Sequence, residues 1–363
     1  MADKIKVLVV DDSMIARKYL SRILEESGRI EVVDTAKNGL EAIDKIKKLN
    51  PDVVTMDVEM PRLNGIEALK VIMKENPVPV IMVSSLTTDG AKETLESLRI
   101  GAVDYISKND VLSFKDSTKE ARQLLIEKIV TAKDAHIRGR RRKPYIYREK
   151  AGLVKEKISV EEKAVTRKKK IEKKDIAVVA IAASTGGPVS LEKVFSKLPL
   201  LGVPILIVQH MPKSFTGVFA NSLSKNSKIK VKEAENGEEL LPNQGYLAPG
   251  GMQMRVKKSG SRYVIDISSE PKTIYTPNAN IMFDSVAEIF GGKALCVIMT
   301  GMGDDGYKGL QKVKERGGTI IAQDKESCVV WGMPRKPTQT GIVDYVVPLE
   351  GIAFTISKII LGG

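Results

Sequence analysis

The sequence predicts two α/β domains, each built on a mostly parallel sheet with helices on both faces. Three observations predict this architecture. The chain has 363 residues, which is more than one compact core usually contains. Short apolar runs alternate with amphipathic stretches in both halves. A strongly basic stretch separates the halves, so we expect domains at 1–137 and 176–363 and a linker at 138–175.

In the first half, five apolar runs of strand length alternate with stretches of helical periodicity. The expected strands are 5–10, 30–36, 51–57, 78–85 and 102–107. The expected helices are 15–27, 39–49, 66–75, 91–100 and 117–135. Such alternation predicts a five-stranded parallel sheet with helices on both faces.

In the second half, the apolar runs are continuous, as in central strands of a buried parallel sheet. They cover 176–184, 203–210 and 294–300, and helical patterns follow at 188–198, 215–225 and 305–315. Between them, 231–267 contains glycine-rich turns and short alternating runs, which predict antiparallel hairpins. The domain is therefore expected to be doubly wound, with an antiparallel excursion.

The net charge of +13 is concentrated in the expected linker, where 138–175 holds 16 Lys and Arg against 6 Asp and Glu. Such a segment is typical of a solvated linker; binding to an acidic partner or anionic lipid is the alternative. Its only aromatic residues are Tyr145 and Tyr147, which does not favour nucleic-acid binding.

The apolar runs and the cysteine count indicate where the protein is located and whether it forms disulfides. No apolar run has the length of a membrane span and no signal-peptide pattern is present, so we expect a cytoplasmic protein. The two cysteines, Cys296 and Cys328, are too few for a disulfide framework and are expected to be packed residues.

Polar residues of the first half cluster where strands end. Asp11 and Asp12 follow the first strand, Asp57 ends the third, and Lys108 follows the fifth. In a parallel sheet these ends meet at one edge, and clustered carboxylates suit Mg²⁺. An aspartate beside Mg²⁺ and a lysine can attack a phosphoryl group. Alternatively the aspartates are helix N-caps, which fits Asp12 but not Asp57 or Lys108.

The second half places Ser184, His210 and Asp305 at the corresponding edge of its sheet. A serine nucleophile needs a histidine base, and the histidine needs a carboxylate that holds its tautomer. The only other histidine, His136, belongs to the last helix of the first half. Two glycines after Thr185 permit a tight turn that exposes the serine and directs backbone N–H groups at an oxyanion.

Two other interpretations of this turn stay open from residue types alone. It could bind phosphate, although it lacks both the G-x-G-x-x-G spacing and a Walker lysine, or it could be inert. Asp305 could equally cap the helix that follows it.

The motifs of 4–135 resemble a bacterial response-regulator receiver domain. They are "VLVVDDSMIAR", "DVVTMDVEMPRLNGIEAL", "PVIMVSSL" and "GAVDYISK". The resemblance implies a flavodoxin-like fold in which Asp57 is phosphorylated and Asp11, Asp12 and Asp57 hold Mg²⁺. It also implies that Ser84 and Lys108 contact the phosphoryl group and that Tyr105 is the aromatic switch residue. Asn109 stands where receivers usually have a proline after the lysine.

The motifs of 176–360 resemble the catalytic domain of the chemotaxis protein-glutamate methylesterases, the CheB family. They are "AIAASTGGPVSLEKVF", "PILIVQHMPKSFTGVFANSL", "GYLAPGG", "IMTGMGDDGYKGL" and "AQDKESCVVWGMPR". The resemblance implies that Ser184 is the nucleophile, His210 the base and Asp305 the orienting acid. It also implies an oxyanion hole formed by the backbone amides of Thr185 and Met302.

Together the resemblances imply a hydrolase, activated by phosphorylation, that demethylates glutamate γ-methyl esters and deamidates glutamines on methyl-accepting chemotaxis receptors. A chemotaxis histidine kinase would donate the phosphoryl group, the ester chemistry would need no cofactor, and membrane association would be at most peripheral, through receptors. Two positions depart from the family: Gln253 replaces a histidine, and "PNAN" at 277–280 replaces "PSVD".

These departures motivate an alternative, a phosphorylation-dependent binding module without hydrolase chemistry. A third class, a DNA-binding regulator, would need a helix-turn-helix, whereas the second half alternates strands with helices. We therefore expect no nucleic-acid partner.

Overall fold

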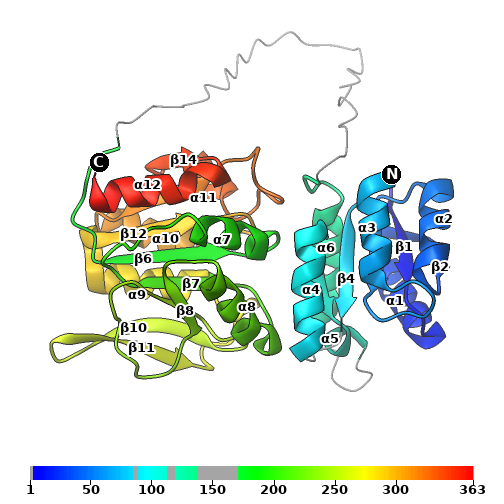
Figure 1. Ribbon diagram of the computed structural model, residues 1–363, viewed down its shortest axis with the longest axis horizontal. Coiled ribbons are helices and arrows are strands. Elements are labelled where there is room, and N and C mark those ends of the chain that lie inside the picture. The colour runs from blue at the N-terminus through cyan, green and yellow to red at the C-terminus, as the bar shows by residue number, and fades with distance from the viewer. Residues whose placement is uncertain (1–2, 85–87, 113–118, 138–170, 363) are drawn as a thin grey trace, which may run out of the picture.

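The computed structural model describes residues 3–84, 88–112, 119–137 and 171–362, and it has two α/β domains lying side by side (Figure 1). Most of the expected linker, 138–170, falls outside the described residues. The predicted fold class is confirmed in both domains, because each contains a parallel sheet between helices.

The N-terminal sheet has five parallel strands in the order β2-β1-β3-β4-β5. The strands are β1 (Ile5–Val10), β2 (Ile30–Ala36), β3 (Val53–Asp57), β4 (Val80–Ser84) and β5 (Asp104–Ser107). The order reverses at β1, so its carboxyl end and that of β3 flank the crevice where doubly wound sheets bind ligands.

Helices cover both faces of this sheet. One face carries α1 (Met14–Glu26) and α6 (Lys119–Ala132), and the other carries α2 (Gly39–Leu49), α3 (Gly65–Glu75) and α4 (Thr88–Ile100). Side-chain caps from Ser13, Asn38 and Asn64 start α1, α2 and α3, as expected for such residues. A short helix, α5 (Lys108–Leu112), was not predicted.

The C-terminal sheet has seven parallel strands in the order β14-β13-β12-β6-β7-β9-β8. They are β6 (Val178–Ala183), β7 (Ile205–Gln209), β8 (Lys230–Glu233), β9 (Gln244–Leu247), β12 (Ala294–Ile298), β13 (Thr319–Gln323) and β14 (Tyr345–Val347). The order reverses between β6 and β12, so the carboxyl end of β6 lies at the crevice where doubly wound sheets bind ligands.

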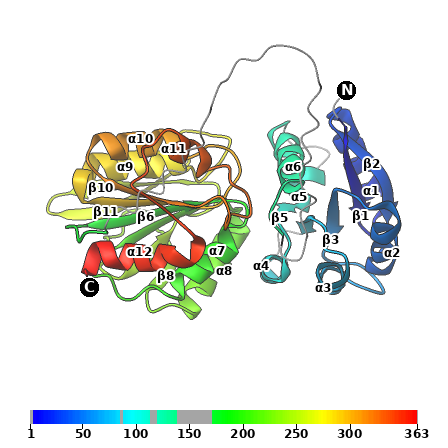
Figure 2. The same ribbon diagram turned by 90° about the horizontal axis from the view of Figure 1, so that it is seen from above.

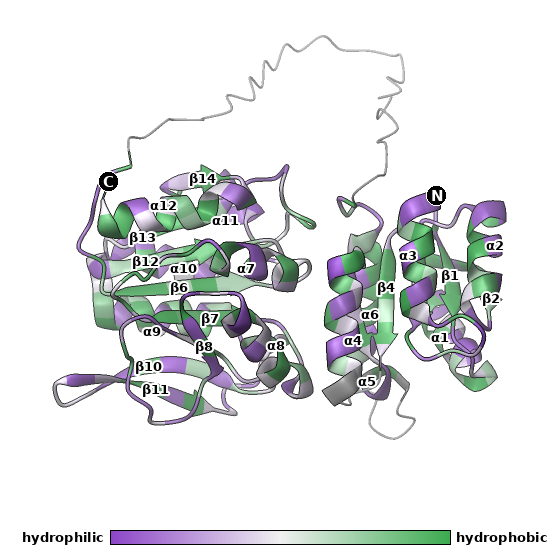
Figure 3. Cartoon of the chain, viewed as in Figure 1, coloured by the Kyte–Doolittle hydropathy of each residue, from purple (hydrophilic) through white to green (hydrophobic). Residues whose placement is uncertain are grey.

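The helices of this domain also form two layers (Figure 2). One layer contains α7 (Gly187–Phe195), α8 (Lys213–Lys225) and α12 (Leu349–Leu361), and the other contains α9 (Ala279–Phe290) and α10 (Tyr307–Glu315). A short α11 (Arg335–Gln339) follows β13. The central strands of both sheets, such as β4 and β6, are strongly hydrophobic, as Figure 3 shows, because helices bury both of their faces.

The segment 231–267, which was expected to form antiparallel hairpins, differs in part from the prediction. β10 (Gln253–Ser259) and β11 (Arg262–Ser268) do form an antiparallel hairpin. β8 and β9, which were expected to belong to hairpins, instead pair in parallel at the edge of the main sheet. Short polar strands such as "KVKE" carry no periodicity that separates an edge strand of a parallel sheet from a hairpin strand.

The two domains pack against each other through α4 and β5 of the first and α7, α8 and the 328–331 loop of the second. Tyr105 stacks on Phe215 with ring centroids 4.7 Å apart. Val330 is buried in the apolar cluster of α1 and α6. In the part of the chain that the structure describes, no helix has the length and apolarity that crossing a membrane requires.

Candidate functional site

Three carboxylates converge at the carboxyl ends of β1 and β3. Oxygen atoms of Asp11, Asp12 and Asp57 lie within 4.8 Å of one another, and Asp11 and Asp57 are buried whereas Asp12 is exposed. Lys108 Nζ lies 2.7 Å from Asp57 Oδ2 and 2.9 Å from Asp11 Oδ2. An oxygen-only donor set with one solvent-facing member fits Mg²⁺, which keeps several of its own waters.

Asp57 is unusual electrostatically. Burial raises its pKa to about 6, the charges of Asp11 and Asp12 act in the same direction, and Lys108 opposes them. A divalent cation beside Asp57 would favour the charged carboxylate. Near pH 6, protonation of Asp57 would therefore compete with the binding of a cation to Asp11, Asp12 and Asp57.

The N-cap alternative for Asp12 is wrong. Ser13 caps α1, since its side chain accepts a hydrogen bond from the backbone N–H of Ala16, and Asp11 in turn accepts from the N–H of Ser13. A serine one residue later reaches the third N–H of the helix, which leaves both aspartates free to face the crevice.

The other residues expected around the phosphoryl group lie on the same edge. Ser84 ends β4 and is buried, and its hydroxyl donates to the carbonyl of Gly90 at 3.4 Å. Asn109 continues α5, and among the described residues the cis peptide bonds precede Pro271 and Pro277. At Asn109, where receivers usually have a proline, the peptide bond after Lys108 is therefore trans and the residue lies in the first turn of α5.

Tyr105 faces the second domain. Its ring stacks on Phe215, and its buried hydroxyl has no hydrogen-bond partner within the described residues. Burial holds the pKa of Tyr105 well above its usual value. The expected switch residue therefore lies at the contact between domains.

Ser184 lies on the turn between β6 and α7. Gly186 has φ of +74°, which favours glycine, and starts α7. A Cβ on Gly187 would overlap the side-chain amide of Gln209 and lie 2.9 Å from the Cβ of Ala183, so this position favours glycine. The turn is closed by a 2.7 Å bond from the N–H of Gly187 to the carbonyl of Ser184. The two glycines are thus explained by backbone geometry.

The next strand places His210 beside Ser184. Ala183 and Gln209 are partners in the pairing of β6 with β7, so the residues that follow them lie next to each other. Gln209 Nε2 donates to the carbonyls of Ser184, at 3.0 Å, and His210, at 3.1 Å. Sequence patterns did not single out Gln209, because a glutamine ending a strand is not distinctive.

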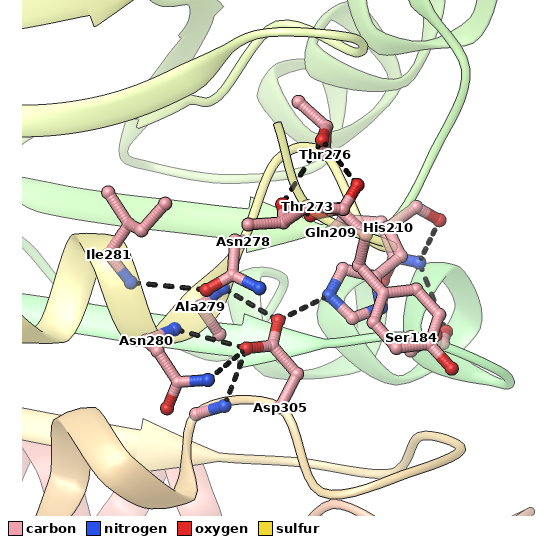
Figure 4. A network of polar contacts seen from close by, with 12 residues as sticks. Ser184, Gln209, His210, Thr273, Thr276, Asn278, Ala279, Asn280, Ile281 and Asp305 are labelled. Atoms are coloured by element: carbon pink, nitrogen blue, oxygen red, sulfur yellow. Dashed lines mark hydrogen bonds and ion pairs between the residues drawn. The ribbon is translucent and has the colours of Figure 1, made fainter. Parts of the chain in front are cut away.

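His210 and Asp305 form a direct contact (Figure 4). Nε2 of His210 lies 2.8 Å from Oδ2 of Asp305. Nδ1 of His210 is buried and has no partner among the described residues. If Nε2–H donates to the carboxylate, Nδ1 carries the lone pair and is the basic nitrogen.

Asp305 does not cap α10, whose N-cap is Gly306. Its carboxylate instead accepts from His210 and from the backbone N–H groups of Ala279, Asn280 and Gly306. Burial by itself raises the pKa of Asp305, but the hydrogen bonds and the interaction with His210 outweigh burial, so the pKa lies below its usual value. Asp305 is therefore a stable anion beside His210.

Thr185 follows Ser184 in the chain, and Met302 follows Gly301, which lies against Ser184. The N–H of Ser184 donates to the carbonyl of Thr300, and a Cβ on Gly301 would lie 2.9 Å from the serine Cβ. Within the described residues, the backbone N–H groups of Thr185 and Met302 have no hydrogen-bond acceptor. Two unpaired donors next to one serine can stabilise negative charge there.

A tyrosine that sequence analysis missed covers the histidine. The ring of Tyr275 stacks on that of His210, with centroids 4.5 Å apart and planes 2° from parallel. Burial raises the pKa of Tyr275 to about 12, and the carboxylates of Glu127, Asp305 and Asp304 add to this effect. Glu127 belongs to α6, so the first domain reaches the surroundings of His210.

Gln253 holds the loop that carries Tyr275. Its buried amide nitrogen donates to the carbonyl of Pro271 and the hydroxyl of Thr273, both at 2.9 Å, and its oxygen accepts from the N–H of Asn278 at 2.9 Å. The replacement of the family's histidine is thus fully hydrogen-bonded within the domain.

The first domain also contacts the serine turn directly. Thr185 Oγ1 donates to Asp104 Oδ2 at 2.5 Å, and Asp104 is ion-paired with Lys128. Arg99 of α4 forms two bonds to Glu192 of α7 and one to Ser222 of α8. A residue adjacent to the expected nucleophile is therefore held by a side chain of the other domain.

Two family models match separate parts of the chain. The family model "Response regulator receiver domain" matches residues 7–113, and the model "CheB methylesterase" matches residues 179–356.

Relatives match over the full length. A Pyrococcus horikoshii protein named "Protein-glutamate methylesterase/protein-glutamine glutaminase" is 43% identical over 100% of this chain and 96% of its own length. A Geobacillus kaustophilus protein of the same name is 44% identical over 98% and 99%. The crystal structure of the Thermotoga maritima CheB methylesterase catalytic domain is 42% identical, covers 50% of this chain and 98% of its own, and has a TM-score of 0.49.

The fold and these sites define the chain as a response regulator whose receiver domain is joined to an enzymatic output domain. It belongs to the protein-glutamate methylesterase/protein-glutamine glutaminase family, the CheB methylesterases of chemotaxis.

Proposed function

We propose that this chain hydrolyses glutamate γ-methyl esters, and deamidates glutamines, on methyl-accepting chemotaxis receptors, and that phosphorylation of Asp57 by a chemotaxis histidine kinase activates it. The observation that carries the proposal is the juxtaposition at the ends of β6 and β7: Ser184 lies beside His210, and Nε2 of His210 contacts the buried carboxylate of Asp305. A serine next to a histidine that is itself bonded to a carboxylate provides the parts of an acyl-transfer site.

In the proposed mechanism, Ser184 Oγ attacks the γ-carboxyl carbon of the methyl ester while Nδ1 of His210 accepts its proton. Asp305 supports the resulting imidazolium through Nε2. The N–H groups of Thr185 and Met302 would donate to the oxyanion, and this arrangement contributes several kcal/mol, roughly 3 per donor in other hydrolases.

The intermediate then collapses. The bond from the γ-carbon to the methoxy oxygen breaks, and His210 returns the proton to this oxygen, so methanol leaves. Water attacks the acyl-serine with His210 again as base, and the free glutamate and Ser184 are restored. With a glutamine the leaving group is ammonia, and every other step is the same.

The receiver site would supply the control. Asp11, Asp12 and Asp57 would hold Mg²⁺, which neutralises charge on the transferring phosphoryl oxygens, and Lys108 and Ser84 would contact that group. The added charge at Asp57 would favour a rearrangement of Tyr105 and α4, which together form much of the contact with the hydrolase domain. Loss of that contact would free Thr185 from Asp104.

The test is methanol release from a methylated receptor cytoplasmic fragment, with and without a small phosphodonor plus Mg²⁺. Wild type is expected to release methanol faster with phosphodonor. Ser184→Ala is expected to release none, a loss of at least about 10⁴-fold, and still to be phosphorylated at Asp57.

Methanol release by Ser184→Ala would remove the proposed nucleophile. No release by wild type under any condition, with Asp57 phosphorylated, would favour the binding-module alternative. The intramolecular bonds of Gln253 give that alternative no support, because they build the site rather than obstruct it.

A further inference from the structure

The side chain of Asn280, at the start of α9, contacts both Asp305, as Figure 4 shows, and the next helix, α10. Its Nδ2 donates to Asp305 Oδ1 at 2.7 Å, and its Oδ1 accepts from the N–H of Gly309 at 2.9 Å. Neither the proposed mechanism nor the expectations from sequence use this residue, which belongs to the divergent "PNAN" segment.

The two oxygens of Asp305 have different partners. Oδ2 faces His210 Nε2 and the N–H of Ala279, whereas Oδ1 receives the N–H groups of Gly306 and Asn280 together with the Asn280 amide. The Asn280 amide is the only side-chain donor to Oδ1 among the described residues. The other donors to Oδ1 are backbone N–H groups, which a point mutation does not remove. The Asn280 amide is therefore the one donor to Oδ1 that a substitution can test for its effect on the orientation of Oδ2 toward His210.

An amide suits this position because it donates and accepts at once without a titratable proton. The helices α9 and α10 pack closely here, because a Cβ on Gly309 would come within 2.8 Å of the Asn280 carbonyl. This close packing holds the N–H of Gly309 against the side-chain oxygen of Asn280. An aspartate, as in the "PSVD" pattern, could accept from Gly309 but could donate to Asp305 only while protonated.

We propose that Asn280 is a positioning residue of the hydrolase: it orients Asp305 for His210, and it does so independently of pH. This inference rests on the proposed function, in which Asp305 supports the imidazolium. Two ionised carboxylates at this distance would repel strongly, so an aspartate at 280 would share one proton with Asp305 over part of the pH range.

The experiment compares three variants. Asn280→Asp makes the donor titratable, Asn280→Leu removes it, and Asn278→Asp is the matched control. Asn278 undergoes the same chemical change two residues away, where its side chain only accepts, from the N–H of Ile281, and an aspartate caps a helix equally well.

Activity is measured as kcat and KM for methanol release from pH 5.5 to 8.5. Asn280→Leu is expected to lower kcat about tenfold or more with little change in KM. Asn280→Asp is expected to introduce a descending limb on the alkaline side, where the shared proton leaves, that neither wild type nor Asn278→Asp shows.

A second readout does not depend on turnover. The chain has two histidines, so the imidazole NMR signals of His210 can be assigned with a His136→Asn variant. The Nε2 proton signal, shifted downfield by the bond to Asp305, is expected to remain in Asn278→Asp and to move or broaden in Asn280→Leu.

Unchanged His210 signals together with wild-type kcat and pH profiles in both Asn280 variants would overturn the inference. Thermal unfolding and phosphorylation at Asp57 are measured for each variant to detect misfolding. If Asn280→Leu is misfolded, the result for Asn280→Asp, which is the smaller change, decides whether the inference stands. If Ser184→Ala proves active, the proposed function fails, but the NMR comparison still shows whether Asn280 positions Asp305.

Discussion

At the scale of single residues, burial changes the ionisation of Asp57, the residue that we propose is phosphorylated. Its carboxyl is buried beside two other carboxylates, and its pKa is raised to about 6. Since the pKa of the unfolded chain is about 4, the folded state holds this proton more tightly. Ionisation of Asp57 therefore lowers the stability of the metal-free receiver as pH rises from about 4 to about 6. A bound cation would reverse this effect.

We predict that Mg²⁺ binding weakens as the pH falls through about 6, because the metal must then displace the proton on Asp57. Isothermal titration of Mg²⁺ from pH 5 to 8 measures this dependence, and a chelator is expected to stop phosphorylation. The control is Asp57→Asn, which keeps Asp11 and Asp12 but should lack the step near pH 6. An affinity for Mg²⁺ that is constant over this range would contradict the prediction.

At the scale of secondary-structure elements, α4 connects the two domains. Its last turn carries Arg99, whose guanidinium bonds Glu192 of α7 at 2.6 and 3.0 Å and Ser222 of α8 at 2.7 Å. Both partners lie on helices of the second domain that follow the strand ends carrying Ser184 and His210. The pair is partly exposed, so its loss alone is worth only about 0.2–1 kcal/mol.

Reversing the charge has a larger effect than removing it. We predict that Arg99→Glu raises methanol release without phosphodonor severalfold, because repulsion from Glu192 weakens the contact between domains, and about 1.4 kcal/mol corresponds to tenfold in the separated population. Activation by phosphodonor should shrink correspondingly. Arg22→Glu is the control, because Arg22 pairs with Glu26 within α1, away from the interface. Equal basal rates in both variants would show that this ion pair does not restrain the enzyme.

At the scale of the whole molecule, the receiver covers the surroundings of the hydrolase site with charged and apolar contacts together. Asp104 holds Thr185, Tyr105 stacks on Phe215, and Glu127 lies near Tyr275. One change at Asp57 can therefore reach the site through several contacts at once.

We predict that Asp57→Asn shows no increase in methanol release when phosphodonor and Mg²⁺ are added, since the amide cannot accept a phosphoryl group. Mass spectrometry of the intact protein checks the modification, and Ser184→Ala serves as the variant that is modified but inactive. An increase that survives in Asp57→Asn would mean that another residue is the acceptor.

Much of the fold followed from local patterns. All five strands of the receiver lie within their expected ranges, because alternation of buried strands with amphipathic helices is visible in a single sequence. The pairing of β8 with β9 was missed, since edge strands this short and polar resemble hairpin strands. The interaction of His210 with Asp305 was anticipated, whereas Tyr275 was not, because no spacing links it to the histidine it covers.

The sequence by itself determined the two α/β domains, the family and the residues at the strand ends, because these depend on periodicity and on motifs local in the chain. Only the tertiary structure decided which side chains surround them. Three such contacts join residues up to 81 positions apart in the chain: Tyr275 stacks on His210, Asn280 bonds to Asp305, and Asp104 bonds to Thr185. Such contacts arise from how helices and domains pack, and packing leaves no periodic signal in the sequence.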